Sequence, residues 1–416
     1  MAEHAAGHAA GHAAGHAAGH AAGHAAGHAA VPSGGLAGRR VAEVLDTSTG
    51  GVGTHLRSVL PALADAGAAV TVCGPAATDA LFGFSAAATF APVEISAGLD
   101  PVADARAVPA LRRALTHGPA GAHLVHAHGL RAGLVAAAAV RLGRGGPRRP
   151  LVVTLHNALP DRSGPLRRVL ETAERATVRA ADVVLAASGD LAANARRLGA
   201  RDVRVAPVSA PALPAATRSR EEVRAGLGLD TGAADGRPLV LAVGRLHPQK
   251  GYDVLLDAAA SWTGDPRPLV AIAGDGPLEA GLDARIRAQR LPVALLGRRD
   301  DVADLLAAAD LVVLPSRWEA RSLTAQEALR AGTPLVATRT GGLPELLGDG
   351  ALLVPPGDAA ALAGAVTGLL ADPARAAALA AAGRAQAESW PDEAATARGL
   401  VAVYRELLGP PGTGAA

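Results

Sequence analysis

Short apolar runs alternate along most of the chain with longer stretches in which apolar residues recur every three or four positions. After Arg39, an apolar run at 41–45 is followed by an amphipathic stretch at 52–66 and by a second run at 69–72. Such short runs predict buried parallel strands, and the stretches between them predict the connecting helices. The alternation therefore predicts a doubly wound α/β fold.

The same rhythm occurs twice. Further strands are predicted in the first half at 124–127, 151–155, 183–186 and 203–206. In the second half they are predicted at 238–243, 269–273, 293–296, 311–314, 335–337 and 352–354. Prolines punctuate residues 206–220, which we interpret as a linker. We thus expect two Rossmann-like domains, at 39–205 and 221–389, that face each other across a crevice, the usual ligand site of such folds.

The first 38 residues follow another pattern, and residues 4–30 repeat His-Ala-Ala-Gly. Histidine recurs at every fourth position, at His4, His8, His12, His16, His20, His24 and His28. In a helix these side chains would form one stripe able to bind divalent metal ions. Glycine at every fourth position opposes helix formation, so we interpret residues 1–38 as a disordered low-complexity tail.

Charge and composition narrow the function classes. The chain has 40 basic and 38 acidic residues, a net charge of +2, which argues against a nucleic-acid partner. Lys250 is the only lysine, and Cys73 is the only cysteine, so an internal disulfide and a cysteine-based zinc site are excluded. The sequence shows neither a leader pattern nor an apolar run of about 20 residues, so we expect a cytoplasmic protein.

A glycine-rich turn follows the first predicted strand. Gly50 and Gly51 stand directly before the first predicted helix. Backbone N–H groups at such a turn can approach a phosphate closely, and the helix dipole adds positive charge there. A plain turn between strand and helix is the alternative interpretation.

Two cations stand five residues apart after the first strand of the second half. Arg245 and Lys250 lie between a predicted strand and a predicted helix. A guanidinium fork and a point charge at this spacing could bind a diphosphate.

Residues 315–329 are predicted to form a loop after a strand and then the start of a helix. Ser322 is a favourable N-cap for this helix, and Leu323 follows it. Glu319 would then lie in the loop and Glu327 within the helix. Carboxylates at these places could accept hydrogen bonds from sugar hydroxyls, and the helix N–H groups could bind phosphate. Two glutamates eight residues apart on a solvated helix face are the alternative.

Together these motifs resemble a known family. They are similar to the motifs of retaining, nucleotide-sugar-dependent glycosyltransferases of family 4, which have the GT-B fold. The matching motifs are the glycine-rich turn, the Gly-Arg-x4-Lys-Gly run, Ala-Gly-Asp-Gly-Pro at 273–277, Leu-Gly-Arg at 296–298 and Glu-x7-Glu at 319–327. The resemblance spans residues 39–408. It implies that the first domain is on the acceptor side and the second binds the nucleotide sugar.

The resemblance implies roles for the donor-binding residues. Arg245 and Lys250 would contact the diphosphate, Glu327 the ribose hydroxyls and Glu319 the hydroxyls of the transferred sugar. The turn at Gly50 and Gly51 would contact donor phosphate or sugar.

Four further positions match the same family. The backbone around Ser322 and Leu323 would meet the phosphate and the sugar, and Gly276 and Arg298 would line the nucleotide pocket. Arg321 stands where the family commonly has a glycine-rich segment, and we hypothesise that it binds phosphate or acceptor.

Histidines end two neighbouring strands of the first half. His128 matches the family's histidine near the transferred sugar, whereas His126 and His156 are expected on the acceptor side. A structural role is the alternative for each. The segment 390–408 resembles the last helix of the family, which returns to the first domain.

The predicted reaction is transfer of a hexosyl group, with retention, from a nucleoside diphosphate sugar to a small-molecule, glycan or lipid acceptor, without a cofactor or an obligatory metal. A nucleotide-sugar-binding protein that does not transfer is the main alternative, and a nucleotide-sugar 2-epimerase is a weaker one. A basic stretch could rest on the inner face of an anionic membrane or could be a solvated face. It comprises Arg141, Arg144, Arg148, Arg149, Arg162, Arg167 and Arg168.

Overall fold

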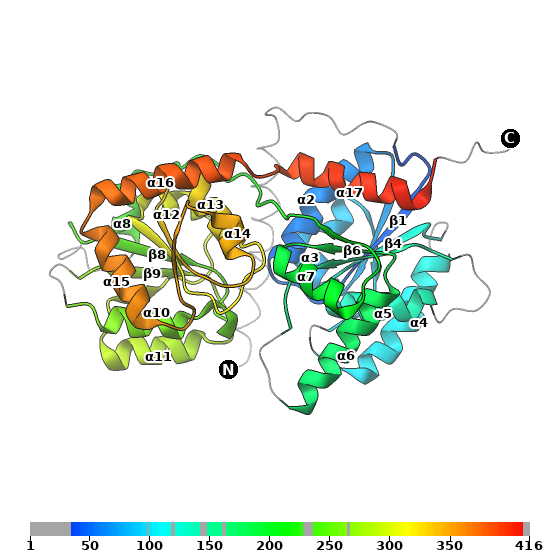
Figure 1. Cartoon of the computed structure of the whole chain (residues 1–416), viewed down its shortest axis with the longest axis horizontal. Coiled ribbons are helices and arrows are strands. Elements are labelled where there is room, and N and C mark those ends of the chain that lie inside the picture. The colour runs from blue at the N-terminus through cyan, green and yellow to red at the C-terminus, as the bar shows by residue number, and fades with distance from the viewer. Residues whose placement is uncertain are drawn as a thin grey trace, which may run out of the picture. The chain divides into compact units, whose positions relative to one another are not determined.

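A computed structural model describes residues 35–96, 98, 100–117, 121–141, 148–159, 164–227, 236–263 and 267–410 (Figure 1). The chain divides into two compact units. The first unit runs to Ser209 and resumes at Pro391, and the second spans Ala210–Trp390. The predicted linker at 206–220 lies across this division. Residues 1–34 of the predicted tail lie outside the described residues, whereas residues 35–38 form a turn in which Leu36 is buried in the core of the first unit, so the fold begins before the predicted boundary.

The first unit is built on a seven-stranded parallel sheet of order β3-β2-β1-β4-β5-β6-β7. Its strands are β1 (Arg40–Leu45), β2 (Ala69–Gly74), β3 (Thr89–Pro92), β4 (Leu124–His128), β5 (Leu151–Leu155), β6 (Val183–Ala186) and β7 (Val203–Val205). The strand order reverses between β1 and β4, so the connecting helices that follow them lie on opposite faces.

Helices cover both faces of this sheet. They are α2 (Gly51–Asp65), α3 (Ala76–Phe82), α4 (Pro101–His117), α5 (Leu130–Arg141), α6 (Pro165–Ala180), α7 (Gly189–Leu198) and α17 (Glu393–Leu408), with the short helix η1 at Phe84–Ala86. Helix α17 packs beside α2, as Figure 1 shows, and its Leu400 and Val401 join the core formed by the apolar face of the sheet. The last helix therefore completes a core made by the first residues of the fold.

The second unit has a six-stranded parallel sheet of order β10-β9-β8-β11-β12-β13. Its strands are β8 (Leu239–Val243), β9 (Leu269–Ala273), β10 (Val293–Leu295), β11 (Leu311–Leu314), β12 (Leu335–Thr338) and β13 (Leu352–Val354). Here the order reverses between β8 and β11.

Two apolar cores flank the second sheet. The helices are α8 (Arg220–Gly226), α10 (Tyr252–Ala260), α11 (Glu279–Gln289), α12 (Val302–Ala308), α13 (Leu323–Ala331), α14 (Leu343–Leu347), α15 (Ala359–Leu370) and α16 (Pro373–Glu388), with η2 at Pro248–Lys250. One core joins α10, α11 and α15 to the sheet, and the other joins α8, α12, α13 and α14. Each face is buried because strands of a parallel sheet carry apolar residues on both sides.

The predicted doubly wound α/β fold is confirmed, and every strand predicted from the sequence is present. Strand β3 was not predicted. Its residues are half-buried or exposed and end in Pro92, so the run lacks the strong apolar signal of the central strands. No helix among the described residues is long and apolar enough to span a membrane.

Candidate functional site

In the second unit, two loops leave the sheet where the strand order reverses. One follows β8 and carries Arg245 and Lys250, and the other follows β11 and carries Glu319. Because β8 and β11 are hydrogen-bonded neighbours, their carboxyl ends place these loops side by side. This topological switch point is where ligands bind in open α/β sheets.

Lys250 and Glu319 form an ion pair at this point. Lys250 Nζ donates a hydrogen bond to Glu319 Oε1 across 2.6 Å, and Ser316 Oγ donates to the same oxygen across 2.9 Å. Only 18% of the lysine side chain and 9% of the glutamate side chain are exposed. A buried charge is costly unless it is paired and hydrogen-bonded, so each partner holds the other in place.

The two loops are also joined by hydrogen bonds to backbone carbonyls. Gln249 Nε2 donates to the carbonyl of Trp318 across 2.9 Å, and the N–H of Arg317 donates to the carbonyl of Gln249 across 2.7 Å. Gly251 has φ +66°, and a Cβ there would lie 2.1 Å from the carbonyl oxygen of Pro315. Only glycine permits this approach, which is why the loop ends in Lys-Gly.

Helix α13 begins beside the same loops. Ser322 is its N-cap, as predicted, and its Oγ accepts a hydrogen bond from the N–H of Ala325 across 3.3 Å. Leu323 is the first helical residue, and Glu327 is half-buried one turn further on. Burial raises the pKa of Glu327 to about 7, against the opposing charge of Arg330. This carboxyl therefore changes its charge near neutral pH.

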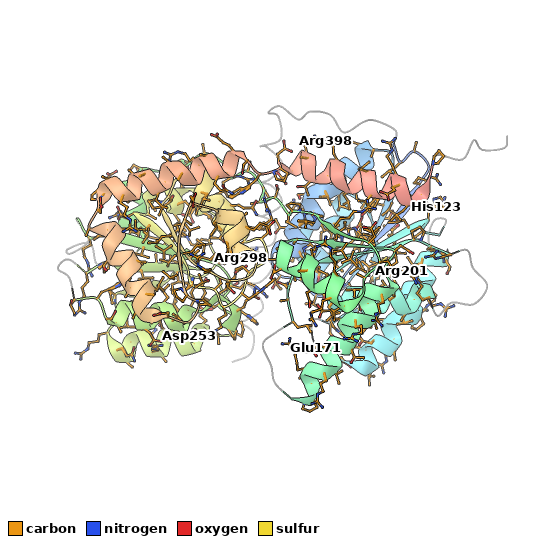
Figure 2. All side chains as sticks on the ribbon, viewed as in Figure 1. His123, Glu171, Arg201, Asp253, Arg298 and Arg398 are labelled. Carbon is orange, nitrogen blue, oxygen red and sulfur yellow. The ribbon has the colours of Figure 1, made fainter. Side chains whose placement is uncertain are left out.

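The remaining predicted residues of the second unit lie in loops that follow its strands. Arg245 is exposed after β8, and Arg298, labelled in Figure 2, is exposed after β10. Gly276 has φ +152°, and a Cβ there would lie 2.6 Å from the carbonyl oxygen of Leu246. The loop after β9 thus packs directly on the loop that carries Arg245 and Lys250.

Arg321 takes part in a packing contact within the second unit. Its guanidinium carbon lies 5.8 Å from the ring centroid of Trp390, and that of Arg330 lies 5.9 Å from the same centroid. Such cation–π contacts stabilise by about 0.5–2 kcal/mol. Trp390 was predicted to start the returning segment, but it packs in the second unit, and the return begins at Pro391.

In the first unit, the glycine-rich turn begins α2. Gly50 is the N-cap and provides no side-chain cap, while Ser48 Oγ accepts the N–H of Gly53 across 3.2 Å. Gly51 is exposed at the first helical position. Asp46 precedes this turn, and burial raises its pKa to about 7 against the opposing charge of Arg131.

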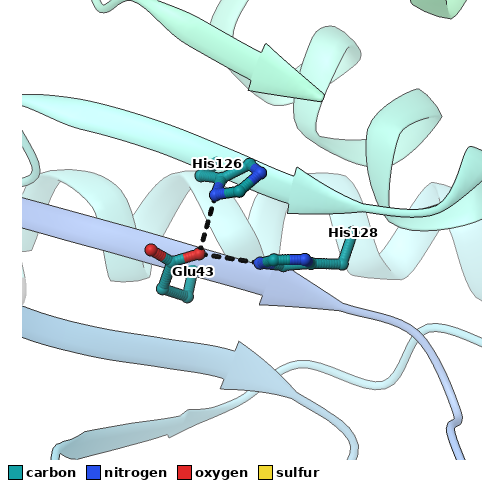
Figure 3. A group of neighbouring side chains, drawn as sticks. All are labelled: Glu43, His126 and His128. Atoms are coloured by element: carbon teal, nitrogen blue, oxygen red, sulfur yellow. Dashed lines mark hydrogen bonds and ion pairs between the residues drawn. The ribbon is translucent and has the colours of Figure 1, made fainter. Parts of the chain in front are cut away.

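Glu43 of β1 meets His126 and His128 of the neighbouring strand β4, at the switch point of the first sheet (Figure 3). His128 Nε2 lies 2.8 Å from Glu43 Oε2, and His126 Nδ1 lies 3.2 Å from the same oxygen. Their side chains are at most 1% exposed. We call these three residues and their partners Thr154, His156 and Tyr404 the histidine network.

The partners extend the network in two directions. Tyr404 of α17 donates its hydroxyl proton to Glu43 Oε1 across 2.6 Å, and its oxygen lies 2.6 Å from His126 Nδ1. His126 Nε2 lies 2.6 Å from Thr154 Oγ1. His128 Nδ1 lies 3.2 Å from His156 Nε2. Polar groups in a core must satisfy one another in this way.

The two neighbouring histidines hold the pKa of Glu43 low. Burial raises the pKa of this carboxyl, but the charges and hydrogen bonds of His126 and His128 outweigh burial and lower the pKa below its ordinary value. Burial lowers the pKa of His126 and brings that of His156 well below 6.5. His55 of α2 packs edge-on against the rings of His128 and His156, and burial lowers its pKa to about 3.

The network has the chemistry of a possible metal site. One ligand atom each of Glu43, His126 and His128 lies within 4.8 Å of the others, and two histidines with a carboxylate can bind zinc. Each of these atoms, however, already has a protein hydrogen-bond partner. The atoms therefore need no metal to be satisfied.

A cavity of about 270 Å³ lies beside the network in the first unit. Its polar wall includes His126 and Thr154, and its apolar wall is formed largely by α17 and the end of β7.

Sequence reasoning brought out His126, His128 and His156 but missed Glu43 and Tyr404. The available signal for Glu43 was a charged residue inside the otherwise apolar run at 41–45. The sequence offered no comparable signal for Tyr404, which reaches the network from 361 positions away.

Comparison with known proteins assigns the chain to a class. The family description "Glycosyl transferase 4-like domain" matches residues 50–211, and "Glycosyl transferases group 1" matches residues 230–386. The D-inositol 3-phosphate glycosyltransferase of Frankia alni is 35% identical over 72% of this chain and 78% of its own length. The alpha-D-kanosaminyltransferase of Streptomyces kanamyceticus is 35% identical over 37% of this chain and 40% of its own length.

Solved structures share the fold. HepE of Anabaena, solved with UDP, superposes with a TM-score of 0.69 at 23% identity, over 88% of this chain and 100% of that chain. The two parallel-sheet α/β units of this chain thus have the GT-B architecture. The chain belongs to the family 4-type GT-B glycosyltransferases and is a sugar-transferring enzyme.

Proposed function

We propose that this enzyme transfers a hexosyl group from a nucleoside diphosphate sugar to a hydroxyl-bearing acceptor, with retention at the anomeric carbon. The observation that carries the proposal is the pairing of Lys250 with Glu319 at the switch point of the second unit. The pair sets a cation for the diphosphate next to a carboxylate for the sugar hydroxyls.

The other donor residues surround this pair. Arg245 binds the diphosphate together with Lys250, and Glu327 accepts hydrogen bonds from the ribose. The first N–H groups of α13, at Ser322 and Leu323, bind phosphate because a helix start carries partial positive charge. Gly276 and Arg298 line the nucleotide side.

In this proposal, the residues themselves stabilise the leaving diphosphate. Arg245, Lys250 and the start of α13 supply preorganised positive charge, which is the largest single contribution in many enzymes. Transfer should therefore continue in the presence of EDTA. Loss of activity on chelation, restored by a divalent metal, would contradict metal independence.

Residues of the first unit face the acceptor and the sugar in this proposal. His128 lies on the sugar side, His126 and His156 on the acceptor side, and Gly50 and Gly51 at donor phosphate or sugar. Since the Frankia relative is named for D-inositol 3-phosphate, a polyol phosphate is the acceptor to assay first. Glycans and lipids carry the same reactive group, a hydroxyl.

The donor is tested first. Thermal shifts with UDP, GDP and ADP sugars rank the nucleotides before an acceptor is known. The best donor is then incubated with D-inositol 3-phosphate and with a panel of sugar acceptors, and the anomeric configuration of the product is read by NMR. An inverted product overturns retention. Tight binding without transfer over the panel favours a nucleotide-sugar-binding protein, and isomerised donor favours a 2-epimerase.

Arg321 is proposed to reach phosphate or acceptor despite its contact with Trp390. Arg321→Ala should weaken donor or acceptor binding. Unchanged donor Kd and kcat/KM would leave Arg321 with the packing role alone.

Contact with an anionic membrane is proposed for α6. Leu166 is 40% exposed and Val169 54% exposed, and exposed Arg168 lies between them in sequence. Other arginines of the basic stretch are engaged, since Arg141 and Arg148 pair with Asp182. Arg144 and Arg162 lie outside the described residues. Sedimentation with phosphatidylglycerol vesicles, against phosphatidylcholine vesicles as control, tests the contact.

A further inference from the structure

The chain passes between its two units at two places. One passage joins Ser209 to Ala210, and the other joins Trp390 to Pro391. On the first-unit side the two passages are hydrogen-bonded to each other, because Ser209 Oγ donates to the carbonyl of Pro391. On the second-unit side, Ala210 and Trp390 both contact side chains of α13. Each passage is therefore held right up to the peptide bond that joins the units.

Helix α13 holds Ala210 through both of its backbone polar groups. The N–H of Ala210 donates to Gln326 Oε1 across 3.0 Å, and its carbonyl accepts from Arg330 Nη1 across 2.5 Å. Gln326 and Arg330 stand four positions apart and so share one face of the helix. Ala210 is 1% exposed and Gln326 is fully buried, and backbone groups buried in this way need such partners.

Arg330 contacts the second passage as well. Its guanidinium carbon lies 5.9 Å from the ring centroid of Trp390, whose Nε1 donates to the carbonyl of Leu346 across 3.1 Å. A planar guanidinium can lie over an aromatic ring and donate hydrogen bonds in its own plane, whereas an ammonium has no such plane. The shape of Arg330 therefore lets one side chain hold both passages.

The same helix carries the proposed donor site. It begins after the N-cap Ser322, and Glu327 stands three positions before Arg330, so these two side chains are neighbours on the helix surface. The charge of Arg330 acts on the Glu327 carboxyl and lowers its pKa against the effect of burial. Arg330 thus interacts with the carboxyl proposed to bind the ribose and with both passages.

We propose that Arg330 is a positioning residue for the nucleotide donor, which fixes α13 to Ala210 and Trp390 and so holds Glu327 and the helix start in place. This role rests on the proposed donor site of α13. Coupling between two sites is reciprocal, so a bound nucleotide should in turn hold Ala210 more tightly. Because the role depends on the planar shape of the guanidinium, lysine should not fulfil it, although lysine supplies the same charge.

One variant and a matched control separate positioning from charge and from stability. Arg330→Lys keeps a positive charge near Glu327 but loses the planar fork. Asp304→Ala is the control, because Asp304 of α12 holds the same linker. It accepts the N–H of Thr217 across 2.6 Å and that of Arg218 across 3.3 Å. No donor-binding residue is predicted on α12, so this variant loosens the linker without reaching the donor site.

Hydrogen exchange at the Ala210 amide is followed by mass spectrometry of the full chain, with and without UDP, GDP or ADP, whichever gives the largest thermal shift. We expect the nucleotide to slow this exchange about tenfold in the wild type and in Asp304→Ala, and to leave it unchanged in Arg330→Lys. Gln326→Leu, which removes the acceptor of the Ala210 N–H, should behave as Arg330→Lys does. Equal slowing in the wild type and in Arg330→Lys, or no slowing in the wild type, would overturn the proposal.

The Kd of the same nucleotide is measured by isothermal titration. Arg330→Lys should raise this Kd about tenfold, because reciprocal coupling gives affinity the same factor as exchange, and Asp304→Ala should leave it unchanged. A wild-type Kd in Arg330→Lys, or an equal rise in both variants, would refute the positioning role. If the wild type binds none of the three nucleotides, the proposed function fails and this role with it, whereas binding that is indifferent to Arg330→Lys refutes this role alone.

Discussion

Lys250 Nζ donates a hydrogen bond to Glu319 Oε1 across 2.6 Å and so joins the loops that follow β8 and β11. Lys250 is the only lysine in the chain, and the pair is largely buried. An ammonium is a compact point charge that can rotate between partners, whereas a guanidinium is a planar fork. The two cations are therefore not interchangeable at this position.

Replacing Lys250 should impair transfer strongly. Lys250→Ala removes charge that stabilises the leaving diphosphate, so kcat/KM should fall at least about a hundredfold. Lys250→Arg keeps the charge but changes its shape, and a smaller loss is expected. Steady-state kinetics with the best donor measure both variants. Arg287→Ala is the control, because this cation is exposed on α11, and near-normal turnover of Lys250→Ala would refute the donor assignment.

The ion pair between Lys250 and Glu319 should also contribute to the free energy of unfolding. Because the side chains are in contact, Lys250→Ala and Glu319→Gln should be non-additive, with a coupling of about 0.5–3 kcal/mol. Lys250→Ala should be the more harmful change, since it leaves Glu319 buried without its cation. Denaturant unfolding of the two variants and the double variant measures the coupling. Additive free energies of unfolding would show that the ion pair contributes nothing.

The fold could be predicted from the sequence because its central strands are short, strongly apolar runs separated by helix-length stretches. Strand β3 could not, since its residues lie at the sheet edge and have a weak apolar pattern. Lys250, Glu319 and Ser322 were predicted because each stands just after a strand or at a helix start. Local sequence carries that information directly.

The histidine network was predictable only in part. His126 and His128 lie on one predicted strand and His156 directly follows the next, so their closeness could be inferred. Tyr404 joins them through the packing of α17 on α2, a tertiary contact between the two ends of the fold. No local pattern in the sequence specifies such a contact.

Donor affinity should depend on pH through Glu327. Burial raises the pKa of Glu327 to about 7, so the carboxyl of the free enzyme ionises as the pH rises through that value. The ionised form accepts hydrogen bonds from ribose hydroxyls, and donor Kd should therefore fall between about pH 6 and 8. Isothermal titration over this range measures the trend.

Glu327→Gln should bind the donor weakly, with little pH dependence, and Glu388→Gln on the exposed side of α16 is its control. The stability of the free enzyme should depend on pH in the opposite direction to donor binding. Since the folded-state pKa lies above 4.5, the stability that Glu327 contributes is present at low pH and is lost as the pH rises through about 7. A pH-dependent donor Kd that persists in Glu327→Gln would assign the dependence to another group.

Gly341 should be essential for the position of Glu319. It has φ +53°, and a Cβ there would lie 2.0 Å from the carbonyl oxygen of Glu319, which also accepts the N–H of Gly342 across 2.9 Å. Gly341→Ala must push this loop away or distort it. Gly357 has φ +78°, but a Cβ there meets no atom within 4 Å, so Gly357→Ala has the backbone strain without the clash.

We expect Gly357→Ala to cost about 1–2 kcal/mol of stability, the penalty for a left-handed alanine, with kcat/KM preserved. Gly341→Ala should cost more and should also lower kcat/KM, because the Glu319 carboxylate shifts relative to Lys250. Thermal unfolding and steady-state kinetics of the two variants make the comparison. If both lose stability equally and Gly341→Ala keeps full activity, the close approach of Gly341 does not set the position of Glu319.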